Sequence, residues 1–311
     1  GTNVTTSSYA WTSNPSGFSS TVSNPSVSPT ITTTYTLVET VKATGCNKSN
    51  SVIITVSALP LANAGTNSTI CNGGSTSIGA SAVSGNTYSW TSNPSGFIST
   101  SSNPSVSPTV TTTFTLTETV TATSCNKSNT VVVTVNPLPA ANAGSSSAIC
   151  VGGSANIGAT AVSGNTYSWT SSPSGFTSTL SNPNVSPTVT TTYTLVETIT
   201  ATSCNKSNSV VITVNPLPSA NAGTSTSICN GSSTTIGASA VSGNTYSWTS
   251  NPSGFTSTSA NPNVSPTITT TYTLTVTDSK GCHIVTTKTI TVAPLSSIIC
   301  GTAPASQGNS A

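Results

Sequence analysis

Apolar and small polar residues alternate along most of the chain, as in Tyr88-Ser89-Trp90 and Phe114-Thr115-Leu116. This period of two predicts β-strands with one buried and one solvated face. Thr, Val, Ile and Tyr dominate these stretches, and Asn-Pro, Ser-Pro and Ser-Gly pairs interrupt them about every 8 to 12 residues, which is typical of a sandwich of short strands. The pattern predicts an all-β protein and excludes helix almost everywhere.

One phrase recurs through the chain with a period of 79 residues. It runs Tyr-Ala/Ser-Trp-Thr-Ser-Asn/Ser-Pro-Ser-Gly-Phe, and its tryptophans are Trp11, Trp90, Trp169 and Trp248. Val-Ser-Pro-Thr, Thr-Thr-Thr-Tyr/Phe-Thr-Leu, a cysteine and a Val/Ile-rich run follow it, and the next unit opens with Ala-Asn-Ala-Gly. Internal repetition of this kind predicts a tandem array of similar domains.

The period predicts four β-sandwich domains of about seven strands each. The expected bounds are 1–60 for a first domain that lacks its opening strands, then 61–139, 140–218 and 219–295, and finally a tail at 296–311. We name the four domains repeats 1 to 4. For repeat 2 the expected strands are Ser68–Cys71, Ser75–Ala82, Thr87–Thr91, Phe97–Ser101, Ser105–Thr109, Thr112–Val120 and Asn129–Asn136.

Aromatic residues recur at positions whose parity points inward. We therefore expect the four tryptophans and their neighbours Tyr88, Tyr167 and Tyr246 to fill the space between two sheets. A platform on which sugar rings stack is the alternative interpretation of the same residues.

Eight cysteines in a chain this poor in charge indicate an oxidising compartment, in which thiols pair. Metal binding is disfavoured because the chain has no Cys-x-x-Cys and a single histidine, His283. The repeat predicts one disulfide per domain, from the first strand to the start of the last strand. The expected pairs are Cys71 with Cys125, Cys150 with Cys204, and Cys229 with Cys282.

Cys46 and Cys300 have no partner in this scheme. The tail around Ile299-Cys300-Gly301 resembles the opening strands that repeat 1 lacks, and joining the end of one copy to the start of another would separate Cys300 from Cys46 by 57 residues, against 54 within a repeat. The tail of one copy could therefore complete repeat 1 of the next, with an inter-copy disulfide between Cys46 and Cys300. This is either strand donation between subunits, which builds a fibre, or a longer covalent array cut out of register.

The chain carries six basic and four acidic residues among 311. Nucleic-acid binding is not expected, because no basic stripe exists to neutralise phosphates. No apolar run is long enough to span a bilayer. Clustered carboxylates for calcium are missing, although Glu39, Glu118 and Glu197 recur, and a β-bulge that turns these glutamates outward would accommodate one extra residue before the cysteine of the first three repeats.

Catalysis is not expected either. A catalytic site needs a nucleophile beside a base or a pair of carboxylates, and His283 has only Asp278 nearby in sequence. We expect no catalytic residue, no metal site and no cofactor.

Taken together, these motifs resemble the PKD-like and immunoglobulin-like repeats of large secreted surface proteins of the Bacteroidota. The resemblance covers essentially the whole chain and implies tandem sandwich domains in an extracellular gliding adhesin, stalk or matrix fibre. The expected function is a structural segment of a cell-surface filament, whose partner is another copy of itself. The alternative is a ligand-binding adhesin module for surface glycans or for ice, in which the Thr-Thr-Thr segments would present a regular hydroxyl face.

Overall fold

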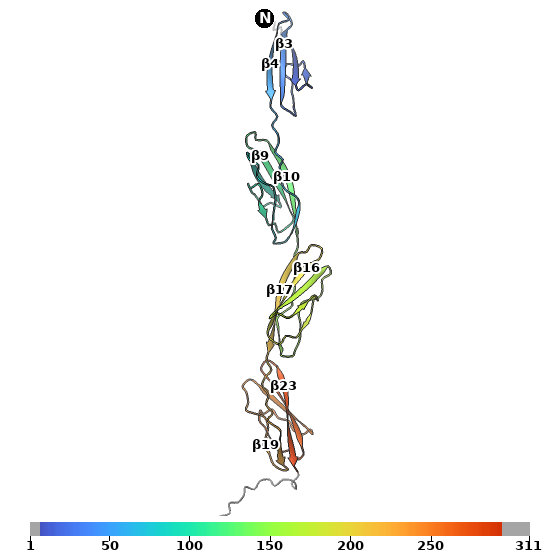
Figure 1. Ribbon diagram of the computed structural model, residues 1–311, viewed down its shortest axis with the longest axis vertical. Helices are drawn as coiled ribbons and strands as arrows, with labels where there is room; N and C mark the ends of the chain where they lie inside the picture. Colours follow the sequence, from blue (N-terminus) through green and yellow to red (C-terminus); the bar gives the residue numbers. More distant parts are fainter. Residues whose placement is uncertain (1–6, 294–311) are drawn as a thin grey trace, which may run out of the picture. The chain divides into compact units, whose positions relative to one another are not determined.

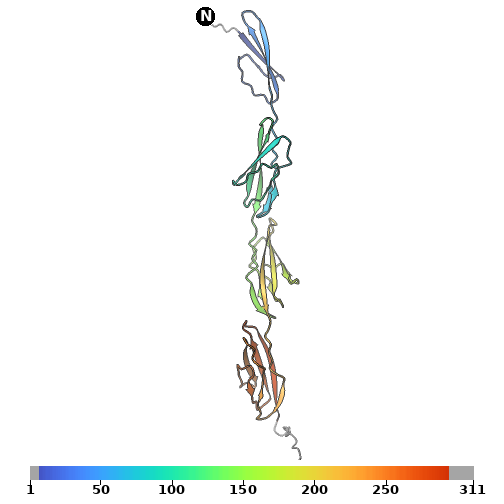
Figure 2. The same ribbon diagram turned by 90° about the vertical axis from the view of Figure 1, so that its left-hand side faces the viewer.

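The computed structural model describes residues 7–293, and all regular secondary structure in that range is β-strand. The strands form sheets that each draw on one repeat only (Figure 2). By its contacts the chain divides into two compact units, Gly1–Pro137 and Leu138–Ala311. Each unit contains two of the sequence repeats.

The strands of the four repeats follow one plan. Repeat 1 contains β1 (Ser7–Asn14), β2 (Ser19–Ser20), β3 (Thr33–Val41) and β4 (Asn47–Ile54). Repeat 2 contains β5 (Ser68–Cys71), β6 (Thr76–Ser77), β7 (Asn86–Asn93), β8 (Ser105–Val106), β9 (Thr112–Val120) and β10 (Asn126–Asn136). Repeat 3 contains β11 (Ser147–Cys150), β12 (Ala155–Asn156), β13 (Asn165–Ser172), β14 (Thr177–Ser178), β15 (Asn184–Val185), β16 (Thr191–Ile199) and β17 (Asn205–Asn215). Repeat 4 contains β18 (Thr226–Cys229), β19 (Thr234–Thr235), β20 (Thr245–Asn251), β21 (Asn263–Val264), β22 (Thr270–Thr277) and β23 (His283–Ala293).

Repeats 2 to 4 are immunoglobulin-like β-sandwiches with a large and a small sheet. In repeat 2 the large sheet has the order β5-β10-β9-β7, and β6 pairs with β8 in the small sheet. The long strands are antiparallel neighbours, and β9 and β10 run side by side in Figure 1. The short opening strand β5 is different, because it pairs with the end of β10 in parallel. The prediction of an all-β tandem sandwich is confirmed.

The strand bounds in repeat 2 agree with the sequence pattern for some strands and not for others. β5 and β9 have the predicted bounds, whereas the strand expected at Ser75–Ala82 is reduced to the two residues of β6. Gly79 ends it, since its φ of +87° turns the chain away from the sheet. The strand expected at Phe97–Ser101 amounts to one bridge between Trp90 and Ser99.

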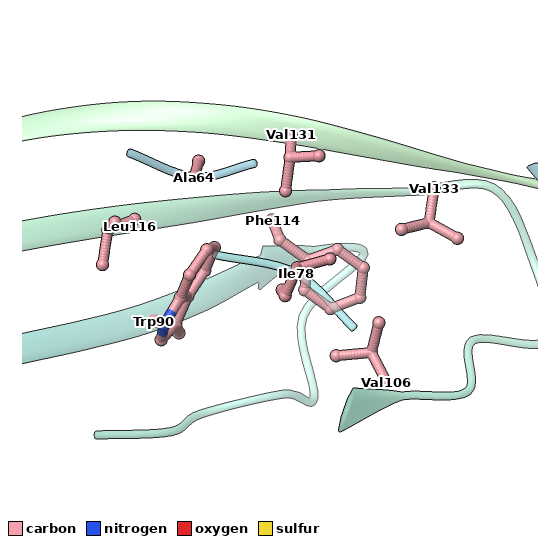
Figure 3. Packing of buried hydrophobic residues seen from close by; sticks show 8 residues of the cluster. All are labelled: Ala64, Ile78, Trp90, Val106, Phe114, Leu116, Val131 and Val133. Atoms are coloured by element: carbon pink, nitrogen blue, oxygen red, sulfur yellow. The ribbon is translucent and has the colours of Figure 1, made fainter. Parts of the chain in front are cut away.

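The core of repeat 2 lies between the two sheets. Figure 3 shows its eight buried side chains, which are Ala64, Ile78, Trp90, Val106, Phe114, Leu116, Val131 and Val133. Trp90 is only 1% exposed, and its indole Nε1 donates a hydrogen bond to the carbonyl of Ser101 at 2.9 Å. Trp169 and Trp248 are equally buried and Tyr88, Tyr167 and Tyr246 pack against the cores, so these rings fill the sandwiches.

The extra residue of the first three repeats lies in a turn and produces no bulge. β9 and β10 pair in continuous register, and the hairpin closes with Val120 N donating to Cys125 O. In repeat 4 the equivalent turn runs from Asp278 to Cys282 and is one residue shorter. The predicted bulge is therefore wrong, and so is the outward glutamate, because Glu118 is 3% exposed in the interior of its repeat.

Candidate functional site

One sheet edge is open in repeat 1, whereas the equivalent edge of each other repeat is paired with that repeat's own opening strand. Its sheet has the order β2-β1-β3-β4, with β4 at the edge, and among residues 7–293 no strand pairs with β4 as β5 pairs with β10. In repeat 2, β5 pairs with β10 from Val133 to Asn136. The equivalent stretch of repeat 1 begins at Ile54, where β4 ends, so β4 has 8 residues and β10 has 11. The last strand stops early where its parallel neighbour is missing.

The open edge of repeat 1 exposes side chains that are core residues elsewhere. Val52 is 49% exposed, whereas its counterparts Val131 and Val210 are at most 1% exposed. Ile53, the next residue, is 64% exposed. Trp11 is only half-buried, in contrast to Trp90. The apolar face that is buried in repeat 2 is therefore open in repeat 1.

The indole of Trp11 also differs from the indole of Trp90 in its hydrogen bonding. Trp11 Nε1 is shielded from solvent and has no hydrogen-bond acceptor, whereas Nε1 of Trp90 bonds to Ser101 O. In repeat 2 the accepting loop is held by Ile78 N, which donates to Pro104 O, and by Ala80 N, which donates to Ser102 O. In residues 7–293 no such pair of backbone bonds holds the corresponding loop of repeat 1.

The recurring glutamate depends on the same opening segment. Glu118 accepts hydrogen bonds from Ala62 N at 2.7 Å and from Asn86 Nδ2 at 2.6 Å. Glu197 is equally buried and accepts from Asn165 Nδ2 at 2.7 Å. Glu39, in the repeat that lacks the segment, is exposed. Glu118 therefore anchors the start of repeat 2 from inside, and the single, separated positions of the three glutamates do not make a calcium site.

The cysteines do not pair as the repeat predicts. Cys150 forms a disulfide with Cys282, with the two Cα atoms 5.5 Å apart and 132 residues between them in sequence. The bond joins the end of β11 in repeat 3 to the residue before β23 in repeat 4. The predicted pairs Cys150–Cys204 and Cys229–Cys282 are therefore wrong.

The direction of the opening strand explains this pairing. Because β11 runs parallel to β17, Cys150 lies beside Asn215 at the end of β17, whereas Cys204 precedes its first residue. Ten residues of strand at ~3.3 Å each separate the two ends by roughly 33 Å. A disulfide needs Cα atoms within about 7 Å, so no bond can form inside the repeat.

The remaining cysteines follow the same geometry. Cys71, Cys204 and Cys229 are disulfide-bonded, while Cys46 and Cys125 are free thiols. The predicted pair Cys71–Cys125 is wrong, because β5 places Cys71 beside Asn136 at the far end of β10. Cys300, the predicted partner of Cys46, lies outside the described residues.

A shallow hollow recurs on all four repeats. In repeat 2 it is lined by Pro94, Gly96, Phe97, Pro108 and Thr109 among others, and its volume is about 410 Å³. The hollows of the other repeats have volumes of about 380 to 390 Å³. Their walls contain no ionisable group other than tyrosine, so they offer hydroxyl and apolar contacts only.

The threonine triplets do not present a regular hydroxyl face. Thr112 is 6% exposed and donates to Val110 O at 2.7 Å, while Thr111 Oγ1 accepts from Val135 N at 3.1 Å. The corresponding threonines of the other repeats make the same two bonds. Two of three hydroxyls are thus used inside the protein, which disfavours ice binding through this face.

Within residues 7–293 no group of three or more histidine, cysteine and acidic side chains could hold a metal ion. His283 is exposed at the start of β23. Asp278 caps its turn, where its Oδ1 accepts from Lys280 N and Cys282 N at 2.9 Å. The described part of the chain also has no helix that could cross a membrane.

Neither a protein-family model nor a curated protein matches the chain. Among solved structures, titin domains I67–I69 are 11% identical over 73% of this chain and 96% of that one, with a TM-score of 0.36. A 1.5-MDa bacterial ice-binding adhesin is 14% identical over 72% of this chain and 94% of that one, with a TM-score of 0.28. The Bacteroides ovatus protein SGBP-B, solved with a mixed-linkage heptasaccharide, is 17% identical over 78% and 69%, with a TM-score of 0.20. Such identities are too low to carry a function from these proteins to this chain.

Proposed function

We propose that the chain is a structural segment of an extracellular fibre or adhesin stalk whose copies assemble head to tail. In this assembly residues 296–311 of one copy take the place of the missing opening strands in repeat 1 of another. The observation that carries the proposal is the open edge at β4, where Val52 is 49% exposed and its counterpart Val131 is 0% exposed.

Strand addition at this edge would satisfy backbone groups as well as cover apolar ones. In repeat 2, Val132 N donates to Asn67 Oδ1 at 2.9 Å, and the equivalent amides of repeats 3 and 4 donate to Ser146 and Ser225 at 3.1 Å. Each acceptor belongs to the segment just before the opening strand. The amide of Ile53 occupies the same position in repeat 1 and faces the open edge.

The tail has the composition of an opening strand. Ile299-Cys300-Gly301 corresponds to Ile228-Cys229-Asn230, and both segments run 11 residues from the cysteine to an alanine. A contact between the tail of one copy and the head of another uses two different surfaces, so it does not close into a dimer and extends into a fibre.

The chemistry of the chain suits an extracellular location. Disulfides persist in oxidising compartments, and five of the described cysteines are bonded. Six Lys and Arg residues in 311 leave few sites for trypsin-like proteases. Membership of the Bacteroidota surface repeats stays a prediction from the motifs.

The test uses a proline at the open edge. Ile53→Pro removes the amide that faces the edge, and proline is tolerated on an edge strand where its missing N–H would point to solvent. Ile53→Ala keeps the amide and is the matched control. We expect electron micrographs to show filaments for the unmodified chain and for Ile53→Ala, and single molecules for Ile53→Pro. Filaments of normal length with the proline variant would refute strand addition at β4.

The recurring hollow supports a second candidate function, the binding of surface glycans. Four copies of one site could bind a repeating saccharide with an avidity that no single hollow provides. Ser107 lines the hollow of repeat 2 and is exposed. Replacing it and the equivalent Ser28, Ser186 and Ser265 by tyrosine would fill the four hollows. Glycan-array binding that these substitutions abolish would support this function, and an array without any binding would exclude it for the glycans tested.

A further inference from the structure

The hollow of each repeat has a frame that internal hydrogen bonds hold in place. In repeat 2, Ser92 Oγ donates to Pro94 O at 2.7 Å and accepts from Phe97 N at 3.1 Å. In the other lining segment, Thr112 Oγ1 donates to Val110 O at 2.7 Å. The other three repeats make the same bonds. The lining residues are therefore positioned before a ligand arrives, which lowers the entropic cost of binding.

One part of the lining is apolar. Phe97 is half-buried and lies edge-on to Phe114, with the ring centroids 5.2 Å apart. Val110 is 55% exposed, so its methyl groups are accessible from the hollow. The equivalent residues are also β-branched and aliphatic, and they are 57 to 58% exposed: Ile31, Val189 and Ile268. Each hollow thus offers an aromatic and an aliphatic surface to the C–H groups of a ligand.

The other part of the lining consists of hydroxyl groups that the protein does not use itself. In repeat 2 they belong to Ser95, Ser107 and Thr109, which are all exposed. Within residues 7–293 none of these three hydroxyls has a hydrogen-bond partner. The other hollows contain the same three residue types, which are Ser16, Ser28 and Thr30, then Ser174, Ser186 and Thr188, then Ser253, Ser265 and Thr267. Each hydroxyl can both donate and accept a hydrogen bond.

The lining has no charged side chain, and this selects among ligands. A carboxylate, sulfate or ammonium group that entered the hollow would lose water without gaining an opposite charge, which is unfavourable. A suitable ligand is uncharged, with an apolar face and several hydroxyl groups. A sugar ring has this form, because its C–H groups gather on one face and its hydroxyl groups surround the edge. The volume of about 410 Å³ lies in the usual range of small-molecule sites, roughly 300 to 1,000 Å³.

We propose that each hollow binds a sugar ring of an uncharged saccharide. In repeat 2 the C–H face of the ring lies against Phe97 and Val110. The hydroxyl groups of the ring exchange hydrogen bonds with Ser95, Ser107 and Thr109. The inference rests on the glycan-binding candidate function, names its class of ligand, and is independent of the head-to-tail assembly.

The first measurement tests the class of ligand. The full chain is applied to an array of oligosaccharides that includes uncharged, amino-substituted, sulfated and uronic-acid members. We expect binding to uncharged members only. For a bound member, raising the salt from about 50 to about 500 mM should change Kd by less than about twofold, because salt screens only interactions between charges.

The second measurement tests the site. A variant with Ile31→Ser, Val110→Ser, Val189→Ser and Ile268→Ser removes the aliphatic contact from all four hollows and keeps the backbone carbonyls that the threonines bond to. We expect each hollow to bind about tenfold more weakly. The matched control is Val83→Ser, Val162→Ser and Val241→Ser, because these valines are also 53 to 54% exposed and do not line the hollows. The control variant should bind as the unmodified chain does.

The outcomes separate the inference from the candidate function. Binding of charged saccharides alone, or binding that falls steeply with salt, would overturn the inference and leave glycan binding standing. The same would follow if the hollow variant and its control bound an uncharged saccharide equally well. An array on which no saccharide binds would overturn both for the saccharides tested. Selective loss of uncharged ligands in the hollow variant would support both.

Discussion

The buried carboxylate of Glu118 gives the sharpest test of how a repeat is closed. It lies 3% exposed and accepts two hydrogen bonds, one from the backbone of Ala62 and one from the side chain of Asn86. Ala62 has a φ of +53°, a conformation that costs a residue with a Cβ about 1 to 2 kcal/mol. The bond from Glu118 therefore helps to hold the opening segment in a backbone conformation that it would otherwise leave.

Replacing Glu118 by alanine would leave the buried amide of Ala62 and the half-buried side chain of Asn86 without this acceptor. An unsatisfied buried donor costs about 1 to 3 kcal/mol, so we expect Glu118→Ala to destabilise the opening segment of repeat 2 by about 3 kcal/mol. Glu118→Gln keeps a carbonyl acceptor for one donor and should cost about half as much. The chain supplies its own control, because Glu39→Ala changes the exposed counterpart and should alter stability by less than about 0.5 kcal/mol.

A local probe is needed, because a chain of four repeats does not unfold in one cooperative step. We expect amide hydrogen exchange at Ala62 to become about a hundredfold faster in Glu118→Ala, since every ~1.4 kcal/mol corresponds to a factor of ten. Exchange in repeat 4 should not change. The reasoning is refuted if Ala62 exchanges at the same rate in the variant, or if Glu39→Ala and Glu118→Ala are equally destabilised.

Gly79→Ala should destabilise repeat 2 by more than about 3 kcal/mol, because a Cβ would lie 2.1 Å from Ser102 O. Gly85→Ala should cost only about 1 to 2 kcal/mol of backbone strain, because no atom lies within 4 Å of the added Cβ. Limited proteolysis of the two variants compares them. Burial raises the pKa of Tyr193 and of Tyr272 above 10, so the stability that depends on their neutral forms is complete below about pH 10 and is lost as the pH rises through the raised values. In alkylated protein, the urea midpoint of the Tyr193→Phe, Tyr272→Phe double variant should fall less between pH 9 and 11.5 than that of the unmodified chain, and an equal fall would contradict this.

Much of the fold could be predicted from residues alone. The alternation around Trp90 predicts both that the segment is a strand and which of its side chains are buried, because neighbouring side chains in a strand point to opposite sides of the sheet. The 79-residue period then transfers every assignment from one repeat to the next. Strands that contribute two residues, such as β6, could not be recognised, since two residues show no alternation and the positive φ of Gly79 that ends β6 is a property of the folded chain.

The disulfide pairing could not be read from spacing. Equal spacing within each repeat is compatible with bonds inside a repeat and with bonds shifted by one repeat, because the period maps each pattern onto itself. The direction of the opening strand decides between these two pairing patterns. A side-chain pattern of four residues does not show this direction. The inward position of Glu118 was missed for a related reason: a carboxylate can be buried only beside donors such as Ala62 N and Asn86 Nδ2, and these are distant in sequence.

A disulfide between two neighbouring repeats has a different effect from a disulfide inside one core. The Cys150–Cys282 bond encloses 132 residues, for which the loop-entropy model gives about 5 kcal/mol. The polypeptide between β17 and β18 already connects repeats 3 and 4, so the disulfide adds a second covalent path across the same junction. It ties the opening strand of repeat 3 to the hairpin turn of repeat 4, and this strand can detach from β17 only while it remains attached to the neighbouring repeat. In a fibre that carries tension, such a bond would keep a detached opening strand close to the edge that it must pair with again.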